Sequence, residues 1–285
     1  MNILEEKLLS AKKVAITGHV NPDGDCIGSV LAIYNYISTV YPEIKLSAYL
    51  EEFSDKFMFL KNSENIKQSV EEDIEFDLLI CVDSADIQRL GFSEVLLQKS
   101  KESINIDHHV SNTEHADYNY VEDVCSTAEL IYKFLEIFKI ELNKKIAEYI
   151  YLGIINDTGN FRHDNVTEKT FEICSKLIKV GVNNHKIANI LFSMSKEKSD
   201  LFGDVYENKV IDDKYGFIYY YLSEEKIKKL NVTKDDTDGI AEFLLKIEGM
   251  ELSLFLREEE GKRKGSLRCN DKYNVNEIAS IFNGG

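Results

Sequence analysis

A continuous apolar run, FDLLICVD at residues 76–83, narrows the choice of fold further than any other segment. A strand with one solvated face alternates apolar and polar residues, whereas an unbroken run indicates a strand buried on both faces. Strands of this kind occur in parallel sheets that are covered by helices. We therefore predict an α/β fold with an N-terminal parallel sheet and helices on both of its faces.

The rest of the chain supplies an alternating order of strands and helices, as parallel sheets require. Strands are predicted at 13–18, 44–50 and 103–109, and helices at 24–40, 126–138, 144–157, 167–181, 184–193 and 196–209. After residue 210 the pattern changes to a hairpin at 211–222, a helix at 237–249, strands at 251–258 and 262–269, and a final helix at 275–282. We expect a larger domain over 1–190, a helical connector over 191–210 and a smaller α/β domain over 211–285.

The charge and the cysteines limit the partners and the compartment. A net charge of −16 over 285 residues argues against a general binder of long nucleic acid, which needs a basic stripe. Small phosphorylated substrates remain compatible, because local cations and bound metals can reverse the field in one cleft. No apolar run approaches the roughly 20 residues that span a bilayer. The five scattered cysteines read as reduced thiols, so we expect a cytoplasmic protein without membrane attachment.

Acidic and histidine side chains recur where predicted strands and helices end. The loop GHVNPDGDCIGS, 18–29, follows the first strand, and Asp83 and Asp107 end two others. Open parallel sheets bind ligands at this edge, and oxygen-rich sites with some imidazole favour manganese or magnesium over zinc. The number of ligands exceeds what one ion needs, whereas two ions about 3.5–4 Å apart would use them all. The candidates are His19, Asp23, Asp25, Asp83, Asp107, His108, His109 and Asp157.

Each of these elements alone has a simpler explanation. NPDGD is a good type I turn, Asp83 could cap a helix, and Asp157 could simply end one. Adjacent histidines after a buried strand, as in Asp107-His108-His109, have little structural use. Together, in this order and at strand ends, the segments indicate a metal site.

These motifs and their order resemble those of the DHH phosphoesterase superfamily. The tail resembles the DHH-associated C-terminal domain in DDTDGIAEFLLKIEGMELSLFLRE, GKRKGSLRCND and VNEIASIFNGG. The two-domain form is similar to bacterial nano-RNases, or oligoribonucleases, and to 3′-phosphoadenosine 5′-phosphate phosphatases. Residues 1–190 would then be the DHH domain and 211–285 the substrate-binding domain. We expect the latter to be truncated, because the family continues from a run of glycines into a histidine, whereas this sequence stops at 283–285.

The resemblance implies two divalent ions, most simply manganese, and assigns their ligands. His19, Asp23 and Asp83 would hold one ion. Asp25, His108 and Asp157 would hold the other, with Asp83 bridging both. Asp107 would orient a histidine from outside the metal shell. His109 would face the scissile phosphate as a charge stabiliser or proton donor, so Asp83 and His109 are the expected catalytic residues.

Substrate contacts are expected in three places. Arg268 matches the family arginine that holds the non-scissile phosphate, and it lies in the basic stretch 257–272. A planar guanidinium suits that role because it can form two parallel hydrogen bonds to an anion. Arg162 and His163 follow DTGNF directly, so we expect them near the substrate as well.

We therefore expect a manganese-dependent phosphoesterase that hydrolyses short oligonucleotides, such as nano-RNA and linear dinucleotides, or 3′-phosphoadenosine 5′-phosphate, with water activated by two metals. It would cleave from an end, because a substrate held by its terminal phosphate presents one bond to the metals. Two alternatives stay open: an inorganic pyrophosphatase or exopolyphosphatase built on the same motifs, and a non-catalytic nucleotide-binding regulator. A homodimer is a further option.

Overall fold

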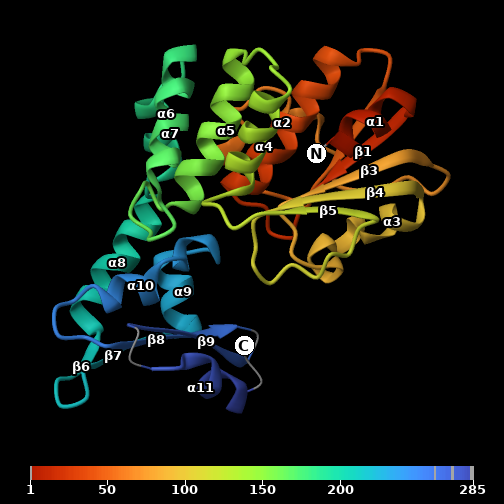
Figure 1. Cartoon of the computed structure of the whole chain (residues 1–285). Helices are drawn as coiled ribbons and strands as arrows, with labels where there is room; N and C mark the ends of the chain where they lie inside the picture. The colour runs from red at the N-terminus through yellow and green to blue at the C-terminus, as the bar shows by residue number, and fades with distance from the viewer. Residues whose placement is uncertain (1, 260, 271–272, 283–285) are drawn as a thin grey trace. The chain divides into compact units, whose positions relative to one another are not determined.

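The structure is a computed structural model that describes residues 2–259, 261–270 and 273–282. The chain forms two compact units, Met1–Ser193 and Met194–Gly285 (Figure 1). Within the described ranges, no helix is both long and apolar enough to cross a membrane. The expected truncation at 283–285 lies outside the described residues. The division at 190 and 210 and the functions assigned to its parts stay predictions.

The first unit is built on a parallel sheet with the strand order β2-β1-β3-β4-β5. Its strands are β1 Lys13–Thr17, β2 Lys45–Tyr49, β3 Phe76–Val82, β4 Ser100–Asp107 and β5 Tyr118–Val121. The short strand β5 was not predicted, because its sequence YNYV is half-buried and lacks an apolar run. β3 lies at the centre, so the segment with the longest apolar run is the one most enclosed by its neighbours.

Both faces of β3 are covered, as the apolar run requires. Leu78, Ile80 and Val82 belong to the large core on one face. Leu79 and Cys81 belong to a smaller core on the other face. Successive side chains of a strand point to opposite faces, so the part of β3 between the two cores, 78–82, is apolar at every position. The predicted α/β fold with helices on both faces is therefore confirmed.

The helices of this unit divide between the two faces. α1, α2, α4 and α5 contribute to the larger core, and the 3₁₀ segment Ile87–Glu94 and α3 supply Leu90 and Leu96 to the smaller one. Their bounds are α1 Asn2–Ser10, α2 Gly24–Val40, α3 Val95–Gln98, α4 Thr127–Ile137, α5 Lys144–Asp157, α6 Glu168–Val180 and α7 Asn184–Leu191. α2, α4 and α5 pack against one another (Figure 1), and this places the start of α2 and the end of α5 close together.

The close packing of α2 on α5 depends on a glycine. A Cβ on Gly28 would lie 2.5 Å from the backbone carbonyl oxygen of Tyr149, and a backbone atom cannot turn away as a side chain can. We expect Gly28→Ala to reduce the free energy of unfolding by about 1–3 kcal/mol, as overpacked cores do. Urea unfolding followed by circular dichroism measures this. Gly203→Ala is the control, because a Cβ there meets no atom of the described ranges within 4 Å.

The second unit contains a four-stranded sheet in the order β6-β7-β8-β9. Its elements are α8 Lys196–Asn208, β6 Val210–Asp212, β7 Phe217–Leu222, α9 Glu224–Leu230, α10 Ile240–Leu245, β8 Leu252–Glu259, β9 Lys262–Cys269 and α11 Val275–Ile281. α8 belongs to this unit, because Leu201 and Val205 are buried in its core. The pairing of β7 with β8 is parallel, and the crossover between them carries α9 and α10. The predicted smaller α/β domain is thus confirmed as a fold.

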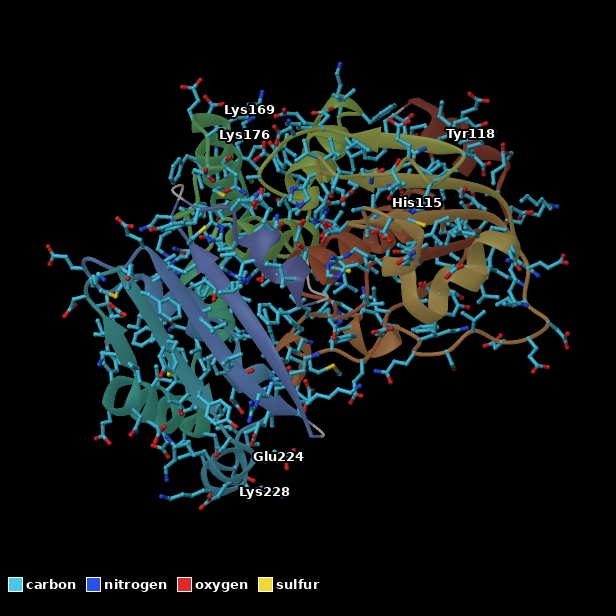
Figure 2. The ribbon with its side chains drawn as sticks, turned by 90° about the horizontal axis from the view of Figure 1, so that it is seen from below. His115, Tyr118, Lys169, Lys176, Glu224 and Lys228 are labelled. Atoms are coloured by element: carbon cyan, nitrogen blue, oxygen red, sulfur yellow. The ribbon has the colours of Figure 1, made fainter. Side chains whose placement is uncertain are left out.

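Two details of this crossover differ from the sequence prediction. α9, which carries Glu224 and Lys228 (Figure 2), was missed because it is short and none of its residues is buried. The helix predicted at 237–249 is wrong at both ends, since α10 covers only Ile240–Leu245. Gly239 has a φ of 85° and Gly249 has the same value. Gly239 directly precedes α10, and its left-handed conformation keeps the helix from starting earlier, whereas the helix already ends at Leu245, before Gly249.

Candidate active site

The carboxyl ends of β1, β3 and β4 meet at one edge of the sheet. Their registers pair Thr17 with Cys81 and Val82 with Ile106, so the residues that follow each strand emerge side by side. His19 follows β1, Asp83 follows β3 and Asp107 is the last residue of β4. The parallel registers therefore bring these side chains together at one edge of the sheet, as predicted.

The loop after β1 serves the helix as well as the site. Asp23 is the N-cap of α2, and its Oδ1 accepts hydrogen bonds from the backbone N–H groups of Asp25 (2.9 Å) and Cys26 (3.1 Å). The same Oδ1 lies 3.8 Å from Nε2 of His19. The segment NPDGD is therefore both a turn and part of the site. The hydrogen bonds that cap α2 also hold the Asp23 carboxylate beside the imidazole of His19.

Asp83 occupies the centre of the cluster. Its Oδ2 lies 3.3 Å from Nε2 of His19, and its Oδ1 lies 3.6 Å from Nε2 of His108. Its backbone has a φ of 55°, which is uncommon for a residue with a Cβ and is found chiefly at turns and functional sites. Asp83 does not cap a helix. The structure places it between two histidines that come from different strands.

The two adjacent histidines have different partners. Nδ1 of His108 pairs with the backbone carbonyl of Val124 (3.1 Å), and its Nε2 lies 3.2 Å from Oδ2 of Asp157. Nδ1 of His109 instead pairs with Oδ1 of Asp107 (2.8 Å). A ring nitrogen that donates its proton to oxygen leaves the opposite nitrogen for another role. For His108 that nitrogen faces the carboxylates, whereas the ring of His109 is partly exposed.

Asp107 is held in turn by a residue that the sequence analysis did not single out. Nδ2 of Asn112 donates to Oδ2 of Asp107 (2.6 Å) and to the carbonyl of Ser84 (3.2 Å). Burial acts to raise the pKa of Asp107, but the hydrogen bonds from His109 and Asn112 outweigh it and lower the pKa. Asp107 is therefore an anion that fixes the ring of His109.

The start of α4 is the largest element of the site that sequence reasoning missed. Asp25 is fully buried, and its carboxylate accepts from the backbone N–H groups of Thr127 (2.7 Å) and Ala128 (2.9 Å). The hydroxyl of Thr127 donates to Oδ1 of Asp83 (3.1 Å). A helix N-terminus stabilises negative charge through its free N–H groups. The available signal was Ser126-x-x-Glu129, a spacing typical of a helix start.

Asp157 ends α5 and is followed by an unusual turn. Gly159, Asn160 and Phe161 all have positive φ values of 54°, 61° and 63°. This turn leads into Arg162 and His163, which are exposed. Nδ1 of His163 pairs with the carbonyl of Asp157 (2.8 Å). His163 thus contacts a candidate ligand, whereas Nε of Arg162 donates to the carbonyl of Gly159 (2.7 Å), and the contact of either residue with substrate stays a prediction.

The cluster has the donor set and the charge balance of a cation site. Asp25, His108 and Asp157 offer ligand atoms within 4.8 Å of one another, and so do Asp83, His108 and His109. A third group of this kind joins His19 and Asp83 to Cys26, a buried thiol that we did not predict there. Nε2 of His108 is buried without a hydrogen-bond partner among the described residues, and it faces carboxylates. A lone pair that faces anions requires a proton or a cation between them, so the residues fit a divalent metal.

The carboxylates of the cluster raise the pKa of the two histidines that they face. Burial acts to lower the pKa of His19, but the carboxylates of Asp23 and Asp83, at 3.8 and 3.3 Å from its Nε2, outweigh it and raise the pKa to about 10. For His108, burial is likewise outweighed by Asp157 and Asp83, and the pKa rises to about 9. Burial and the neighbouring carboxylates raise the pKa of Asp25 well above its usual range. A bound cation would compete with these protons.

We therefore expect divalent-metal affinity to rise with pH. The imidazolium–carboxylate pairs stabilise the fold fully below pH 6.5, the ordinary histidine pKa, and lose this contribution as pH rises through about 9 and 10. Below those values a cation must displace protons, so affinity should increase by up to about tenfold per pH unit for each proton released. Titration calorimetry of Mn²⁺ in buffers of different ionisation enthalpy counts the protons. Equal affinity at pH 6.5 and 8.5 would contradict this reading of the cluster.

A family comparison agrees with the geometry. The model of the DHH family N-terminal domain matches residues 13–154, which run from the start of β1 into α5. Through these residues the chain belongs to the DHH family. The DHH domain contains His19, Asp23, Asp25, Asp83, Asp107, His108 and His109, whereas Asp157 lies three positions beyond the match. The resemblance inferred from sequence is confirmed.

Relatives extend the similarity over both units. A protein of Streptococcus mutans named probable bifunctional oligoribonuclease and PAP phosphatase NrnA is 29% identical, over 98% of this chain and 88% of its own length. A Thermus thermophilus protein named bifunctional oligoribonuclease and PAP phosphatase NrnA is 27% identical, over 100% and 85%. The reaction class predicted from the sequence, hydrolysis of phosphate esters, agrees with the DHH family and these names.

Solved structures give the same fold. An exopolyphosphatase-related protein from Bacteroides fragilis superposes with a TM-score of 0.92 at 26% identity, covering 100% of this chain and 87% of its own. A putative family II inorganic pyrophosphatase from Methanococcus jannaschii has a TM-score of 0.53 at 21% identity, covering 91% and 88%. The second likeness concerns the fold alone.

Arg268, the predicted phosphate ligand, lies in the second unit. It is on β9 opposite Ser253 of β8, and its side chain is 51% exposed. It lines a cleft of about 330 Å³ within this unit. Its Nε lies 2.5 Å from Oε1 of Glu242, and its Nη1 donates to the carbonyl of Leu267 (2.8 Å). The predicted residue is therefore accessible, although it already has an anionic neighbour.

Proposed function

We propose that this protein is a manganese-dependent phosphoesterase that hydrolyses short oligonucleotides and small nucleotide phosphates such as 3′-phosphoadenosine 5′-phosphate. The observation that carries the proposal is Nε2 of His108, which is buried among carboxylates and has no hydrogen-bond partner within the part of the chain that the structure describes. It supports two metal ions that share Asp83, with the ligand sets that the family resemblance implies. The names of the relatives support the substrates. A cytoplasmic location is part of the proposal and is consistent with five free cysteines.

In this proposal two bound cations would activate a water molecule as nucleophile and neutralise the phosphoryl oxygens that it approaches. The remaining work falls to residues of the chain. Asp107 holds Nδ1 of His109, so the opposite nitrogen of that ring is available to a phosphoryl oxygen or the leaving oxygen. Thr127 and the start of α4 hold Asp83 and Asp25 in place.

The substrate proposal has a direct test. The purified protein with Mn²⁺ should convert a 5′-phosphorylated dinucleotide to mononucleotides and should release phosphate from 3′-phosphoadenosine 5′-phosphate. Polyphosphate and pyrophosphate, assayed beside them, represent the alternative that the name of the Bacteroides fragilis structure raises. Faster turnover of polyphosphate would replace the proposal by that alternative. Binding of nucleotides without any turnover would replace it by the non-catalytic regulator.

The role of Arg268 predicts a difference between two substrates. If its guanidinium holds the non-scissile phosphate, Arg268→Ala should lower kcat/KM for a 5′-phosphorylated dinucleotide. The loss should correspond to about 1.5–3 kcal/mol of transition-state binding free energy, the scale of a charge-assisted hydrogen bond. An aryl phosphodiester has no second phosphate, so its hydrolysis should lose far less. Equal losses on both substrates would point to a folding role for β9. Lys262→Ala, at the exposed start of β9, is the control.

A further inference from the structure

The cleft around Arg268 is strongly charged with both signs. Its cationic lining comes from Lys234, Arg257, Lys264 and Arg268, and its acidic lining comes from Asp238 and Glu242. The whole chain has a net charge of −16, so four cations around about 330 Å³ form a local exception. A cleft of this kind suits an anion of high charge density, such as a phosphate.

Strand geometry puts three of these cations on one face. Lys264, Ser266 and Arg268 alternate along β9, and they pair across the sheet with Arg257, Phe255 and Ser253 of β8. Arg257 stands directly opposite Lys264, and like charges in that position repel each other. Such a pair is expected where an anion binds between or beside the two side chains.

The guanidinium of Arg257 already has partners. It is 8% exposed, and it donates to the hydroxyl of Thr237 (2.8 Å) and to Oε2 of Glu259 (3.0 Å). Arg257 is therefore fixed in the wall of the cleft. Arg268 is half exposed and stands at the surface of the same cleft. Of these two arginines, Arg268 is the one that an incoming anion can reach most easily.

The carboxylate of Glu242 takes the position that a phosphate oxygen would need. Glu242 lies in the first turn of α10, and its Oε1 accepts from Nε of Arg268 at 2.5 Å. A guanidinium binds carboxylate and phosphate through planar pairs of donors, and the pair on its side edge includes Nε. With Nη1 directed to the carbonyl of Leu267, a two-point contact to phosphate along the Nε edge requires Glu242 to leave.

The pair can open at low cost. The side chain of Glu242 is 45% exposed and that of Arg268 is 51% exposed, so water can solvate both after they separate. An exposed ion pair of this kind changes the equilibrium between its closed and open forms by up to roughly fivefold. The contact is thus strong enough to weaken phosphate binding and too weak to prevent it.

We propose that Glu242 is an intramolecular competitor for Arg268, which lowers the affinity of the cleft for every phosphate-bearing ligand, including mononucleotide products and inorganic phosphate. This inference rests on the proposed function in one respect, the binding of the terminal phosphate by Arg268. The carboxylate sets how much phosphate is needed to occupy the cleft, and it hastens the departure of products that carry a phosphate.

The test is Glu242→Gln, which removes the charge and keeps the shape. KM for a 5′-phosphorylated dinucleotide should fall by roughly three- to fivefold, with a smaller change in kcat. The inhibition constant of inorganic phosphate should fall by the same factor. Glu248→Gln is the matched control, because it removes an exposed charge of the same unit outside the lining of the cleft. It should leave both constants as they are.

A second variant separates this inference from the function on which it rests. In an Arg268→Ala background, Glu242→Gln should no longer change either constant, because the group for which Glu242 competes has been removed. An unchanged or higher KM in Glu242→Gln, or an equal gain with and without Arg268, would overturn the competitor role. Arg268→Ala alone tests whether Arg268 binds the terminal phosphate, through a larger loss on the dinucleotide than on an aryl phosphodiester. Phosphate binding by Arg268 can therefore hold while the competitor role of Glu242 fails, and the two failures are distinguishable.

Discussion

Replacing Asp83 by alanine should abolish hydrolysis and reduce bound manganese well below two ions per chain. Asp83 lies between His19 and His108, with its two oxygens 3.3 and 3.6 Å from their Nε2 atoms. Removal of a carboxylate shared by two ions weakens the binding of both ions. The imidazoles of His19 and His108 also lose the carboxylate that lies between them. Metal analysis of the dialysed protein, together with turnover of a dinucleotide, measures the two effects.

A matched control distinguishes loss of the site from loss of the fold. Asp73→Ala removes an exposed carboxylate of the same unit and should keep metal and activity. The Asp83→Ala protein should also keep the circular dichroism of the wild type, since the contacts of the removed carboxylate are with His19, His108 and Thr127 of the site and not with the apolar core. Full manganese occupancy in folded Asp83→Ala protein would exclude Asp83 as the bridging ligand.

The second large effect is expected at His109. Its Nδ1 is held by Asp107 at 2.8 Å, and 34% of its side chain is exposed, as a group that meets substrate requires. His109→Ala should lower kcat by roughly 10²–10³, the scale of one lost donor to the transition state. Manganese content should stay close to the wild-type value. Single-turnover kinetics and metal analysis on the same preparation provide both numbers.

The geometry makes the His109 result decisive between two assignments. Asp83, His108 and His109 also offer ligand atoms within 4.8 Å of one another, so His109 could itself bind metal. Loss of manganese in His109→Ala would favour that assignment and would reject our role for the residue. His185→Ala serves as the control, because His185 lies on α7 and pairs with Asn189 at the surface. It should change neither kcat nor metal content.

Much of the fold could be predicted because its determinants are local. The apolar run at 76–83 specifies a strand with two buried faces, and a helical period specifies α4 and α5. The ends of these elements carry the candidate ligands, so the sheet edge could be predicted as well. β5 and α9 could not, because short elements with half-buried or exposed residues have no periodic pattern to detect.

The residue types at the ends of the strands, and the kind of chemistry that they support, can be read from the order of the amino acids. The partners of these residues follow from the packing of the folded chain. Asp25 meets the start of α4 across 102 positions of sequence, Asn112 holds Asp107, and Glu242 occupies Arg268. Periodicity and turn signals describe interactions over a few residues. Contacts between distant residues depend on how whole helices and sheets pack, and that packing is set by many side chains acting together.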